Sequence, residues 1–566
     1  MGRSKPDGAR HARSRPFELL RELVFQERGD VVSVAIFSLA VGLLSLVVPI
    51  GAQTIVNNAS FATFNQPVVF MLLAVFAGLG LAGVFKIFQT IVVERIQVRL
   101  FARSAMRLAE RIPLVDAEKL REHHDGGAKL SRWVNRFFDV LTVQKSAAGL
   151  LLDGVSVFLQ AIIGLVLLAF YHPILLAFDL VLIVGLLFVL FVMGRGLVDT
   201  SIHESYRKHD VAGWLEDLAD KPILFRTKLG YAFALERSDS LVESYVLSRR
   251  AHFRKFVLQV AMFVLIQVFA SVVLLGLGSW LVTQNQLTLG QLVAAELVVS
   301  SVLASLLKLE KPLENFYDLC AALDKLMSLE SLPLEKQTFA SIPSQLNGTG
   351  PMELEFKDVH QSGADGRWIL QGISFRLQPG EHAFITGRKG AGKSTVTNLC
   401  YGLMEASRGT ISMDREDMRL IPREVLRTHV ALVGPIELLP GTLAQNLSLG
   451  QPSVDSRELR EILVRLRIYD DILAFKDAFE TVMSSDGSPF SHVQIRMIVL
   501  ARAILLRPRL LILDRFFDEL DDESLNLAMD EVLRPQSPWT AIVTTARPDL
   551  IRTGYRSIHL AAGRVA

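Results

Sequence analysis

Long apolar stretches dominate the first 310 residues and predict helices that cross a membrane. About twenty apolar residues in helical form span the hydrocarbon core of a bilayer, which is roughly 30 Å thick. Six stretches of this kind are present, and six buried helices of such length would be unusual in the core of a soluble protein. The predicted spans are Val31–Val56, Pro67–Thr90, Ala148–Tyr171, Pro173–Val192, Phe256–Val282 and Leu289–Leu307.

The pattern changes after Leu332. Residues 333–350 are rich in polar and turn residues, which is typical of a linker. From Pro351 onwards, short apolar strands alternate with helical patterns, as in an α/β domain, and Met352–Phe356 alternates as an edge strand would. The predicted division is a cytoplasmic tail at 1–30, a six-span membrane domain at 31–325, a linker at 326–350 and an α/β domain at 351–566.

The charges add a direction to this arrangement. The chain has 60 Lys and Arg against 58 Asp and Glu, a formal net charge of +2 that gives no global attraction to nucleic acid. Basic residues gather in the tail and in the long connections at 93–147 and 193–255, whereas the short connections at 57–66, 172 and 283–288 have none. Because Lys and Arg mark the cytoplasmic side, we expect a multi-pass protein of the plasma (inner) membrane with both termini inside. The basic residues include Arg3, Lys5, Arg10, Arg13, Arg15, Arg95, Arg99, Arg103, Arg107, Arg195, Arg207 and Arg254.

The ends of the chain and of the loops carry further expectations. The first thirty residues lack an apolar core, so they do not predict a cleaved signal peptide. Both long connections are rich in helix formers and predict membrane helices that continue into the cytosol. Each is expected to turn back through a short transverse segment, near Pro113–His124 and Asp210–Asp220, which could dock on the soluble domain. The alternative is a solvated helical hairpin without a partner.

A phosphate-binding pattern follows the predicted strand His382–Thr386. The sequence GRKGAGKST at 387–395 matches G-x-x-x-x-G-K-[ST], in which glycines let backbone N–H groups curl around phosphate oxygens. The lysine reaches the β- and γ-phosphates, the serine can ligate Mg²⁺, and the following helix adds its positive end. The strand–loop–helix context supports the match. The predicted nucleotide-binding residues are Gly387, Arg388, Lys389, Gly390, Ala391, Gly392, Lys393, Ser394 and Thr395.

A second strand, Leu510–Asp514, consists of four apolar residues that end in an acid. Such a buried parallel strand can deliver its carboxylate to a magnesium ion beside the phosphates. The alternative is an ordinary core strand that ends in a solvated aspartate. We therefore predict that Asp514 joins the phosphate loop in binding nucleotide phosphates with Mg²⁺, and that Ser394 and Asp514 are the metal ligands.

Together, the six spans, the long cytoplasmic connections and the C-terminal phosphate loop resemble an ATP-binding-cassette (ABC) exporter half-transporter. The segment Leu287–Ala294 is similar to the one that such exporters place before their sixth span, and Leu500–Pro508 resembles the end of their signature helix. The resemblance covers about residues 20–560. It implies an α/β P-loop ABC domain, ATP-linked transport through a lipid bilayer, and pairing as a homodimer or a heterodimer with another half-transporter. It leaves the transported substrate unknown.

The sequence departs from the family pattern at most positions that carry chemistry. The departures are Gly434 at the Q-loop glutamine, Phe490–Gln494 (FSHVQ) at the signature LSGGQ, Arg515 at the glutamate after the Walker B aspartate, Ala546 at the switch histidine, and Ser362 at the aromatic that stacks on adenine. His360 or Trp368 could take the place of that aromatic. The domain is therefore predicted to be a degenerate nucleotide-binding domain with no catalytic residue of the usual kind.

These departures predict an ABC-type ATPase fold that binds ATP and hydrolyses it poorly or not at all. Arg515 cannot accept a proton from water, and general-base catalysis is worth about 10²–10⁴-fold. In this family each ATP lies between the phosphate loop of one subunit and the signature of the other. His492 and Val493 put side chains where the signature glycines would be, so a homodimer would contain no intact site.

Three functions stay open at this stage. The first is an exporter subunit that binds ATP weakly or statically, the second a membrane scaffold or regulator that retains the exporter fold, and the third an exporter driven by protons. Asp153, Asp179 and Glu296 lie inside predicted spans, where acids are costly and often functional. The alternative is that they pair with polar neighbours or face a water-filled cavity.

The remaining chemistry-bearing residues have simpler explanations. His123 and His124 lie beside acids in the first cytoplasmic connection, where a solvated turn explains them better than a metal site. Cys320 and Cys400 are expected as packing residues, since a reducing compartment requires no disulfide between them.

Overall fold

The computed structural model describes residues 15–566 except 60–65, 117–118, 121–129, 285, 287, 336–345, 347, 364, 452–454 and 552–553. The chain divides into two compact units. The first comprises residues 1–114 and 127–332, and the second comprises residues 115–126 and 333–566. His123 and His124 lie outside the described residues.

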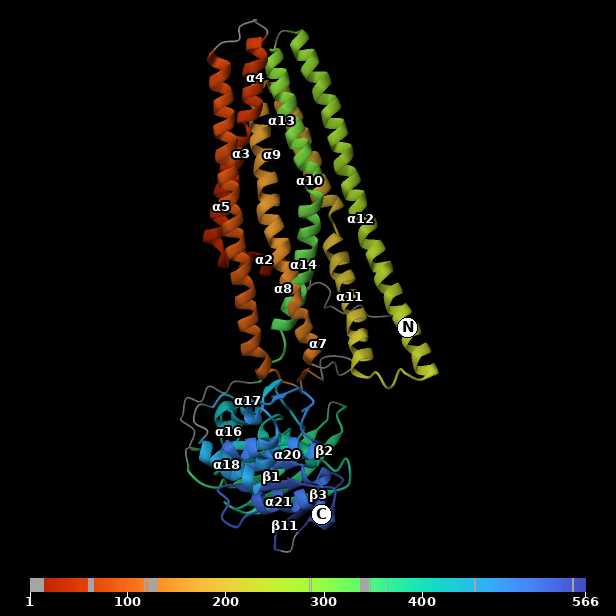
Figure 1. The fold of residues 1–566 in the computed structure, drawn as a ribbon. Coiled ribbons are helices and arrows are strands. Elements are labelled where there is room, and N and C mark those ends of the chain that lie inside the picture. Colours follow the sequence, from red (N-terminus) through yellow and green to blue (C-terminus); the bar gives the residue numbers. More distant parts are fainter. Residues whose placement is uncertain are drawn as a thin grey trace, which may run out of the picture. The chain divides into compact units, whose positions relative to one another are not determined.

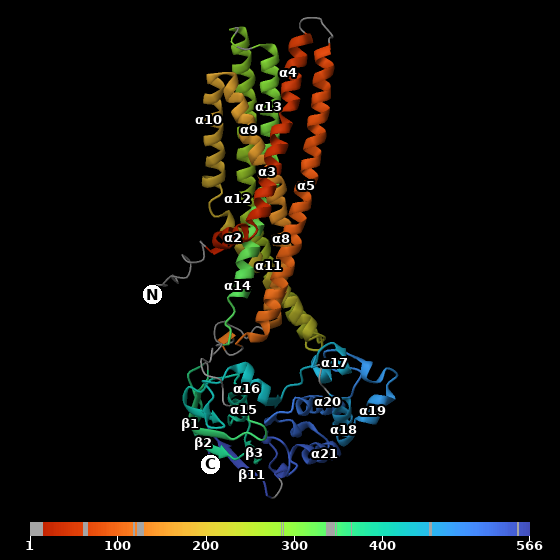
Figure 2. The same ribbon diagram turned by 90° about the vertical axis from the view of Figure 1, so that its left-hand side faces the viewer.

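Long helices make up the first unit (Figure 1). The α-helices are α2 Arg15–Gln26, α3 Arg28–Ser45, α4 Val47–Ala59, α5 Gln66–Arg111, α7 Leu130–Val134, α8 Asp139–Gly149, α9 Val155–Tyr171, α10 Pro173–Phe188, α11 Leu197–Asp220, α12 Lys228–Thr283, α13 Leu289–Leu307 and α14 Glu310–Glu330. Short 3₁₀ helices cover Ile112–Leu114 (η1) and Asn135–Phe138 (η2). Figure 2 shows α3 and α4 running beside α5, and helices α9, α10, α12 and α13 share one buried apolar cluster.

Within the described residues, five helical stretches are long and apolar enough to cross a membrane. They are Arg28–Asn57, Val68–Leu114, Asn135–Leu167, Pro173–Met193 and Lys228–Thr283. These five contain or overlap the first five predicted spans and indicate a multi-pass membrane protein. The sixth predicted span coincides with α13 but does not count among the five, so the number of six spans stays a prediction.

Two spans continue far beyond a bilayer, as the sequence predicted. Helix α5 has 46 residues and α12 has 56, and at about 1.5 Å per residue both are much longer than a hydrocarbon core is thick. The transverse segment expected at Asp210–Asp220 is wrong, because these residues are the last turns of α11. The chain reverses only at residues 221–227, where Pro222 disfavours helical backbone in the residue before it.

The other expected transverse segment, Pro113–His124, is described only in part. Its first residues belong to η1, and Val115 then forms an isolated antiparallel bridge with Leu334. The amide of Asp116 donates a hydrogen bond of 2.8 Å to the carbonyl oxygen of Pro333. The described residues from Val115 onwards therefore pack with the beginning of the second unit, to which they belong.

Three of the predicted spans are interrupted α-helices. Helices α3 and α4 meet at Leu46, inside the first predicted span. The third and fourth spans contain π-helical turns at Leu150–Gly154 (η3) and Val189–Met193 (η4). The fully buried Gln89 donates hydrogen bonds to the carbonyl oxygens of two η3 residues at 3.3 and 3.5 Å, and the fully buried Gln259 donates to the first carbonyl of η4 at 3.2 Å. Each π-turn is thus held by a glutamine from a neighbouring helix.

A buried ionic cluster joins α8, α11 and α14. Lys325 Nζ lies 3.2 Å from Asp139 Oδ1 and 3.0 Å from His209 Nδ1, and His209 Nε2 lies 3.3 Å from Asp139 Oδ2. Lys325 is only 1% exposed. Burial lowers the pKa of Lys325 to about 8, although the charge of Asp139 acts in the opposite direction.

The second unit is built around two main sheets. Its strands are β1 Leu354–Ser362, β2 Trp368–Leu377, β3 His382–Gly387, β4 Arg408–Met413, β5 Glu416–Asp417, β6 Val430–Val433, β7 Gly441–Thr442, β8 Val482–Met483, β9 Leu510–Asp514, β10 Thr540–Thr544, β11 Arg556–Ala561 and β12 Arg564–Val565. Its α-helices are α15 Lys393–Tyr401, α16 Arg423–His429, α17 Leu443–Ser448, α18 Ser456–Arg465, α19 Tyr469–Ala474, α20 His492–Leu505 and α21 Asp522–Val532, with 3₁₀ turns at Ala478–Glu480 (η5), Phe517–Glu519 (η6) and Pro548–Leu550 (η7). Residues 326–330, assigned from composition to the linker, form the end of α14.

The strand order explains where the phosphate loop emerges. The larger sheet has the order β12-β11-β3-β10-β9-β6, in which all neighbours except β12 are parallel, and the smaller antiparallel sheet has the order β2-β1-β4-β5. Successive residues of β9 enter different apolar clusters, so both faces of this strand are buried, as predicted. The carboxyl ends of β3, β10 and β9 consequently lie side by side.

The expected edge strand is wrong. It begins at Leu354 and, as β1, lies between β2 and β4. The alternation that suggested an edge reports one buried face of the strand and gives no information on how many neighbours the strand has.

Candidate nucleotide-binding site

The phosphate loop connects β3 to α15, as predicted. Gly387, Gly390 and Gly392 have φ angles of +147°, +86° and +98°, which side chains disfavour. A Cβ atom at Gly387 would lie 2.3 Å from the carbonyl oxygen of Leu560, and one at Gly392 would lie 2.5 Å from Leu370 Cδ2. Nothing lies within 4 Å of a Cβ built on Gly390. Two glycines are therefore required by close packing, and the third borders open space.

The other predicted loop residues occupy different environments. Arg388 and Lys389 are exposed, Ala391 is buried, and Ser394 and Thr395 are half-buried at the start of α15. The exposed basic pair places positive charge on the outer side of the loop.

Lys393 lies under the loop and is 6% exposed. Its ammonium group donates hydrogen bonds of 2.6 Å to the carbonyl oxygen of Gly387 and 3.2 Å to that of Arg388. Burial lowers the pKa of Lys393, and among its charged neighbours Asp518 opposes this most strongly, ahead of Asp514. The lysine thus contacts the loop directly, and the charges of Asp518 and Asp514 act on its ammonium group.

Ser394 and Asp514 come together as predicted. Ser394 Oγ donates a hydrogen bond of 3.2 Å to Asp514 Oδ1, and Thr544 Oγ1 donates one of 2.6 Å to the same oxygen. A hydroxyl and a carboxylate are the oxygen ligands that Mg²⁺ prefers beside phosphates. A Cβ on Gly434 would lie 3.7 Å from Asp514 Cβ, so the expected glutamine position adjoins this pair. Together with the open space at Gly390, this donor set fits a magnesium-bound polyphosphate.

The residues after Asp514 include a carboxylate that the sequence analysis did not predict. Arg515 has a φ of +53°, its side chain is exposed, and its amide donates to Thr544. The carboxylate of Asp518 accepts a hydrogen bond from Thr545 Oγ1 and one of 3.1 Å from the amide of Ala546. A carboxylate is therefore present at the strand ends although Arg515 and Ala546 lack the expected groups.

Asp518 was not predicted from the sequence, because a catalytic carboxylate was expected only at the position directly after Asp514. Phe516 and Phe517, which are 1% and 0% exposed, anchor the chain in the core. The turn η6 then brings Asp518 back towards the phosphate loop at residues 387–395, which we call the cradle. The available signal was an acid that follows two consecutive apolar residues just beyond a buried strand.

An aromatic pair lies close to the cradle. Trp368 pairs with Ser362 across β1 and β2, and its ring centroid is 5.7 Å from that of His360 at an angle of 70°. The next residue, Ile369, places its carbonyl oxygen 3.4 Å from a Cβ built on Gly392. The two proposed substitutes for the adenine-stacking aromatic thus occur together, with Trp368 partly exposed.

The signature segment forms the beginning of α20. Ser491 and Gln494 form a capping box, in which Gln494 N donates to Ser491 Oγ at 3.3 Å and Ser491 N donates to Gln494 Oε1 at 2.9 Å. The side chain of His492 is 59% exposed, and Val493 packs against the core. The two residues that match the family signature therefore cap the helix, while the replaced glycines carry side chains at its first turn.

The three acids inside predicted spans have different surroundings. Asp153 Oδ1 lies 3.9 Å from Lys86 Nζ, and Glu296 Oε1 accepts a hydrogen bond of 3.1 Å from Ser300 Oγ. Asp179 is 3% exposed, and neither of its carboxylate oxygens has a hydrogen-bond partner among the described residues. Polar neighbours thus account for Asp153 and for one oxygen of Glu296, but not for Asp179.

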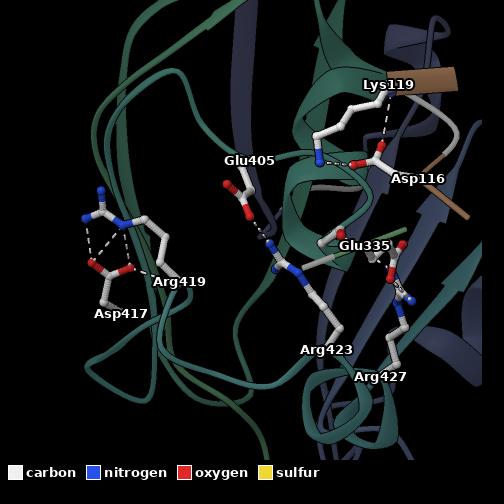
Figure 3. Close-up of polar contacts among 9 residues, drawn as sticks. Asp116, Lys119, Glu335, Glu405, Asp417, Arg419, Arg423 and Arg427 are labelled. Atoms are coloured by element: carbon white, nitrogen blue, oxygen red, sulfur yellow. Dashed lines mark hydrogen bonds and ion pairs between the residues drawn. The ribbon is translucent and has the colours of Figure 1, made fainter. Parts of the chain in front are cut away.

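A separate set of ion pairs lies near the beginning of the second unit (Figure 3). Arg427 makes two hydrogen bonds to Glu335, at 2.8 and 2.7 Å, and Lys119 Nζ lies 2.5 Å from Asp116. Because each of these cations has a carboxylate partner, the set anchors residues around the bridge of Val115 and Leu334 and does not resemble a phosphate site.

Comparison with known proteins supports the reading of both units. The sequence model described as ABC transporter matches residues 370–517. The chain is 29% identical over 304 residues to the alpha-hemolysin translocation ATP-binding protein HlyB of Escherichia coli O157:H7. This alignment covers 53% of this chain and 42% of that protein. It is 30% identical over 208 residues to human ATP-binding cassette sub-family B member 6, covering 36% of this chain and 25% of that protein.

The fold matches over almost its whole length. A solved bacterial Atm1-family ABC exporter with ATP bound has a TM-score of 0.80 at 20% identity, covering 95% of this chain and 94% of that chain. In sequence, by contrast, the match spans less than half the length of each of these two curated relatives. The chain thus combines an ABC transporter domain with apolar helices in the fold of an ABC exporter half-transporter.

Proposed function

We propose that the protein is an ABC exporter-type transport subunit of the plasma (inner) membrane that binds ATP with Mg²⁺ and hydrolyses it poorly or not at all. The observation that carries this proposal is the contrast inside one site. The cradle, Lys393, Ser394 and Asp514 are assembled for phosphate and metal, whereas Arg515 and Ala546 occupy the positions expected to act on water.

Binding is supported by the geometry of the donors. Backbone amides of the loop, the Lys393 ammonium and the first turn of α15 together offer a concentrated positive field to phosphate oxygens. Ser394 and Asp514 would hold the magnesium ion, which when bound offsets the charge of the β- and γ-phosphates. Trp368 is the residue that we expect to stack on the adenine.

Slow hydrolysis follows from the missing groups. The Arg515 guanidinium offers only N–H donors and no acceptor, so it cannot take a proton from attacking water. Gly434 and Ala546 have no side-chain donor or acceptor to orient that water. Losing a general base costs about 10²–10⁴-fold in rate, so turnover well below that of ordinary members of this fold is expected.

We propose that the subunit works as a dimer, with both termini in the cytoplasm. In a head-to-tail pair, the first turn of α20 would face the nucleotide of the partner. His492 and Val493 would then weaken the partner's site, so the subunit alters both sites of any heterodimer.

Two measurements on the purified full chain test the proposal. A fluorescent ATP analogue with Mg²⁺ should bind, and Lys393→Ala should weaken that binding, whereas Lys476→Ala, at an exposed lysine outside the phosphate loop, serves as the control. Phosphate release should be barely above the Lys393→Ala background. No binding at millimolar nucleotide would refute the binding claim, and turnover of the order of 1 s⁻¹ would refute slow hydrolysis, since typical enzymes reach about 10 s⁻¹.

The replaced signature favours a second candidate, a non-hydrolysing membrane scaffold or regulator that retains the exporter fold. His492 is exposed at the first turn of α20, where a transporter requires close approach of backbone to phosphate. Under this alternative, Lys393→Ala would leave the cellular function intact. Loss of function in that variant would instead support the transport role.

A further inference from the structure

We propose that Asp518 is the carboxylate that orients the attacking water and accepts its proton at the nucleotide site, and that the slow hydrolysis of this chain depends on it. This inference rests on the proposed function, since it requires that ATP occupies the cradle. It assigns a role to a residue that is absent from the sequence-based site.

Among the described acids from Asp514 to Asp521, Asp518 is the one that does not lie at the metal position, pair with a cation or cap a helix. Asp514 accepts hydrogen bonds from Ser394 and Thr544 at the metal position. Glu519 pairs with Arg496, and Asp521 caps α21 by accepting from the amides of the first helical residues at 3.1 and 3.0 Å. Asp518 is half-buried and has the largest electrostatic effect of any charged neighbour on Lys393.

Two contacts hold the Asp518 carboxylate in place. Thr545 Oγ1 donates to one oxygen, and the amide of Ala546 donates to the other at 3.1 Å. Thr545 is itself fully buried, with its amide bonded to the carbonyl oxygen of Ile385 at 3.1 Å, directly before the phosphate loop. The carboxylate is thus positioned by the carboxyl ends of β3 and β10 and cannot swing freely into solvent.

The bound carboxylate keeps the capacity to act on water. A carboxylate has about four lone-pair sites, and the two observed donors use only two of them. The other sites can accept hydrogen bonds from a water molecule near the γ-phosphate of ATP held by Lys393. Because Thr545 and Ala546 already occupy two of these sites, fewer lone pairs remain to orient the water, which is consistent with slow hydrolysis.

The reaction balances as an ordinary phosphoryl transfer to water. The water oxygen forms a bond to the γ-phosphorus while the bond from that phosphorus to the β–γ bridging oxygen breaks. The proton of the water passes to the Asp518 carboxylate and then to solvent. The products are ADP and inorganic phosphate, and no oxidant, reductant or additional reactant is required.

The experiment uses the full-length protein and two independent readouts. Equilibrium binding of a non-hydrolysable fluorescent ATP analogue with Mg²⁺ is measured beside phosphate release from ATP, each over pH 5 to 9. The variants are Asp518→Asn, which keeps the size and polarity of the side chain, and Asp518→Glu, which keeps the carboxylate. Asp522→Asn removes one charge from the exposed start of α21 as a matched control, and Lys393→Ala gives the background rate.

We expect Asp518→Asn to reduce phosphate release to the Lys393→Ala background across this pH range, with analogue affinity unchanged. Asp518→Glu should recover part of the rate, and Asp522→Asn should behave as the wild type. An unchanged rate and pH profile in Asp518→Asn would overturn the inference. A parallel loss of affinity and rate would also overturn it, because the residue would then only support the fold.

The wild-type measurements separate this inference from the proposed function. Analogue binding without phosphate release above the Lys393→Ala background would overturn the role of Asp518 and leave ATP binding in place. Absence of analogue binding by the wild type would overturn the proposed function itself.

Discussion

Lys325 Nζ lies 3.2 Å from Asp139 Oδ1, and both side chains are buried where α8, α11 and α14 meet. His209 bridges the two, since its ring nitrogens lie 3.0 Å from the ammonium and 3.3 Å from the carboxylate. A buried pair of this kind stabilises little compared with apolar residues of equal size, but losing one partner leaves the other charge uncompensated. The cluster therefore fixes how the three helices pack.

We predict that Lys325→Met destabilises the first unit by about 3–5 kcal/mol, because Asp139 then stays buried without a cation. The double variant Lys325→Met/Asp139→Leu should recover most of that loss. Thermal unfolding of the detergent-solubilised protein measures both effects. Equal destabilisation in the single and double variants would contradict the explanation.

The same lysine predicts how stability depends on pH. Burial lowers the pKa of Lys325 to about 8 from its ordinary value of 10.5, so between these values the unfolded chain binds more protons than the folded chain. Stability from this residue should therefore rise as the pH increases from about 8 to 10.5. The Lys325→Met/Asp139→Leu variant should lack this rise, and an identical pH dependence in the two proteins would exclude Lys325 as its source.

Two glycine substitutions should separate strain from steric clash in the phosphate loop. Gly390→Ala introduces only the cost of a left-handed residue, about 1–2 kcal/mol, because its Cβ meets nothing within 4 Å. Gly387→Ala additionally places a Cβ 2.3 Å from the carbonyl oxygen of Leu560, where backbone must move. We expect Gly387→Ala to abolish analogue binding and Gly390→Ala to weaken it; the reverse order would contradict the geometry.

Trp368→Ala should weaken nucleotide binding if the indole stacks on adenine. Stacking of a base on an aromatic side chain is worth about 1–3 kcal/mol, which corresponds to roughly 5- to 150-fold in Kd. Trp368→Phe should retain most of the affinity, and His360→Ala serves as the control for the neighbouring ring. Equal affinity of the Trp368→Ala variant for ATP and for inorganic triphosphate would support the role, whereas an unchanged Kd for ATP would refute it.

Asp179 should react with a hydrophobic carbodiimide. Neither oxygen of Asp179 has a hydrogen-bond partner among the described residues, and its helix packs in an apolar cluster, so we expect a reagent that partitions into the bilayer to modify this acid. Asp153 lies near Lys86 and should stay unmodified, which makes it the internal control. Peptide mass spectrometry after labelling reads out the site, and adducts on Asp153 but none on Asp179 would disprove the expectation.

The features that depend on local pattern were predictable from sequence. Five spans, the long extensions of α5 and α12, and the strand–loop–helix at Lys393 follow from apolar length and glycine spacing within single segments. The π-turns were not predictable, because they depend on Gln89 and Gln259 from other helices. The break at Leu46 did have a signal in Pro49, which lacks a backbone N–H and whose ring conflicts with the carbonyl group four residues earlier, at Ser45.

In the candidate site, too, the features set by local sequence were predictable and those set by the folded chain were not. Ser394 and Asp514 meet as expected because parallel strands end at one edge of the sheet. Asp518 escaped notice because its position depends on the burial of Phe516 and on the return of the chain through η6. Motif spacing identifies residues that occupy usual positions, but it does not detect a side chain that reaches the same place by another backbone path.

The π-turn η3 has a consequence for how a membrane span and its cytoplasmic continuation are oriented. A π-turn accommodates one more residue than an α-turn, and one residue corresponds to about 100° of rotation around a helix axis. The residues of α8 are therefore rotated in phase relative to those of α9, because η3 joins these two helices directly, whereas a turn at residues 194–196 separates η4 from α11. A stripe of residues that faces lipid in the span does not continue on the same side below it. The helical phase of α8 relative to its span is thus offset by a single residue, held in place by the amide of the buried Gln89.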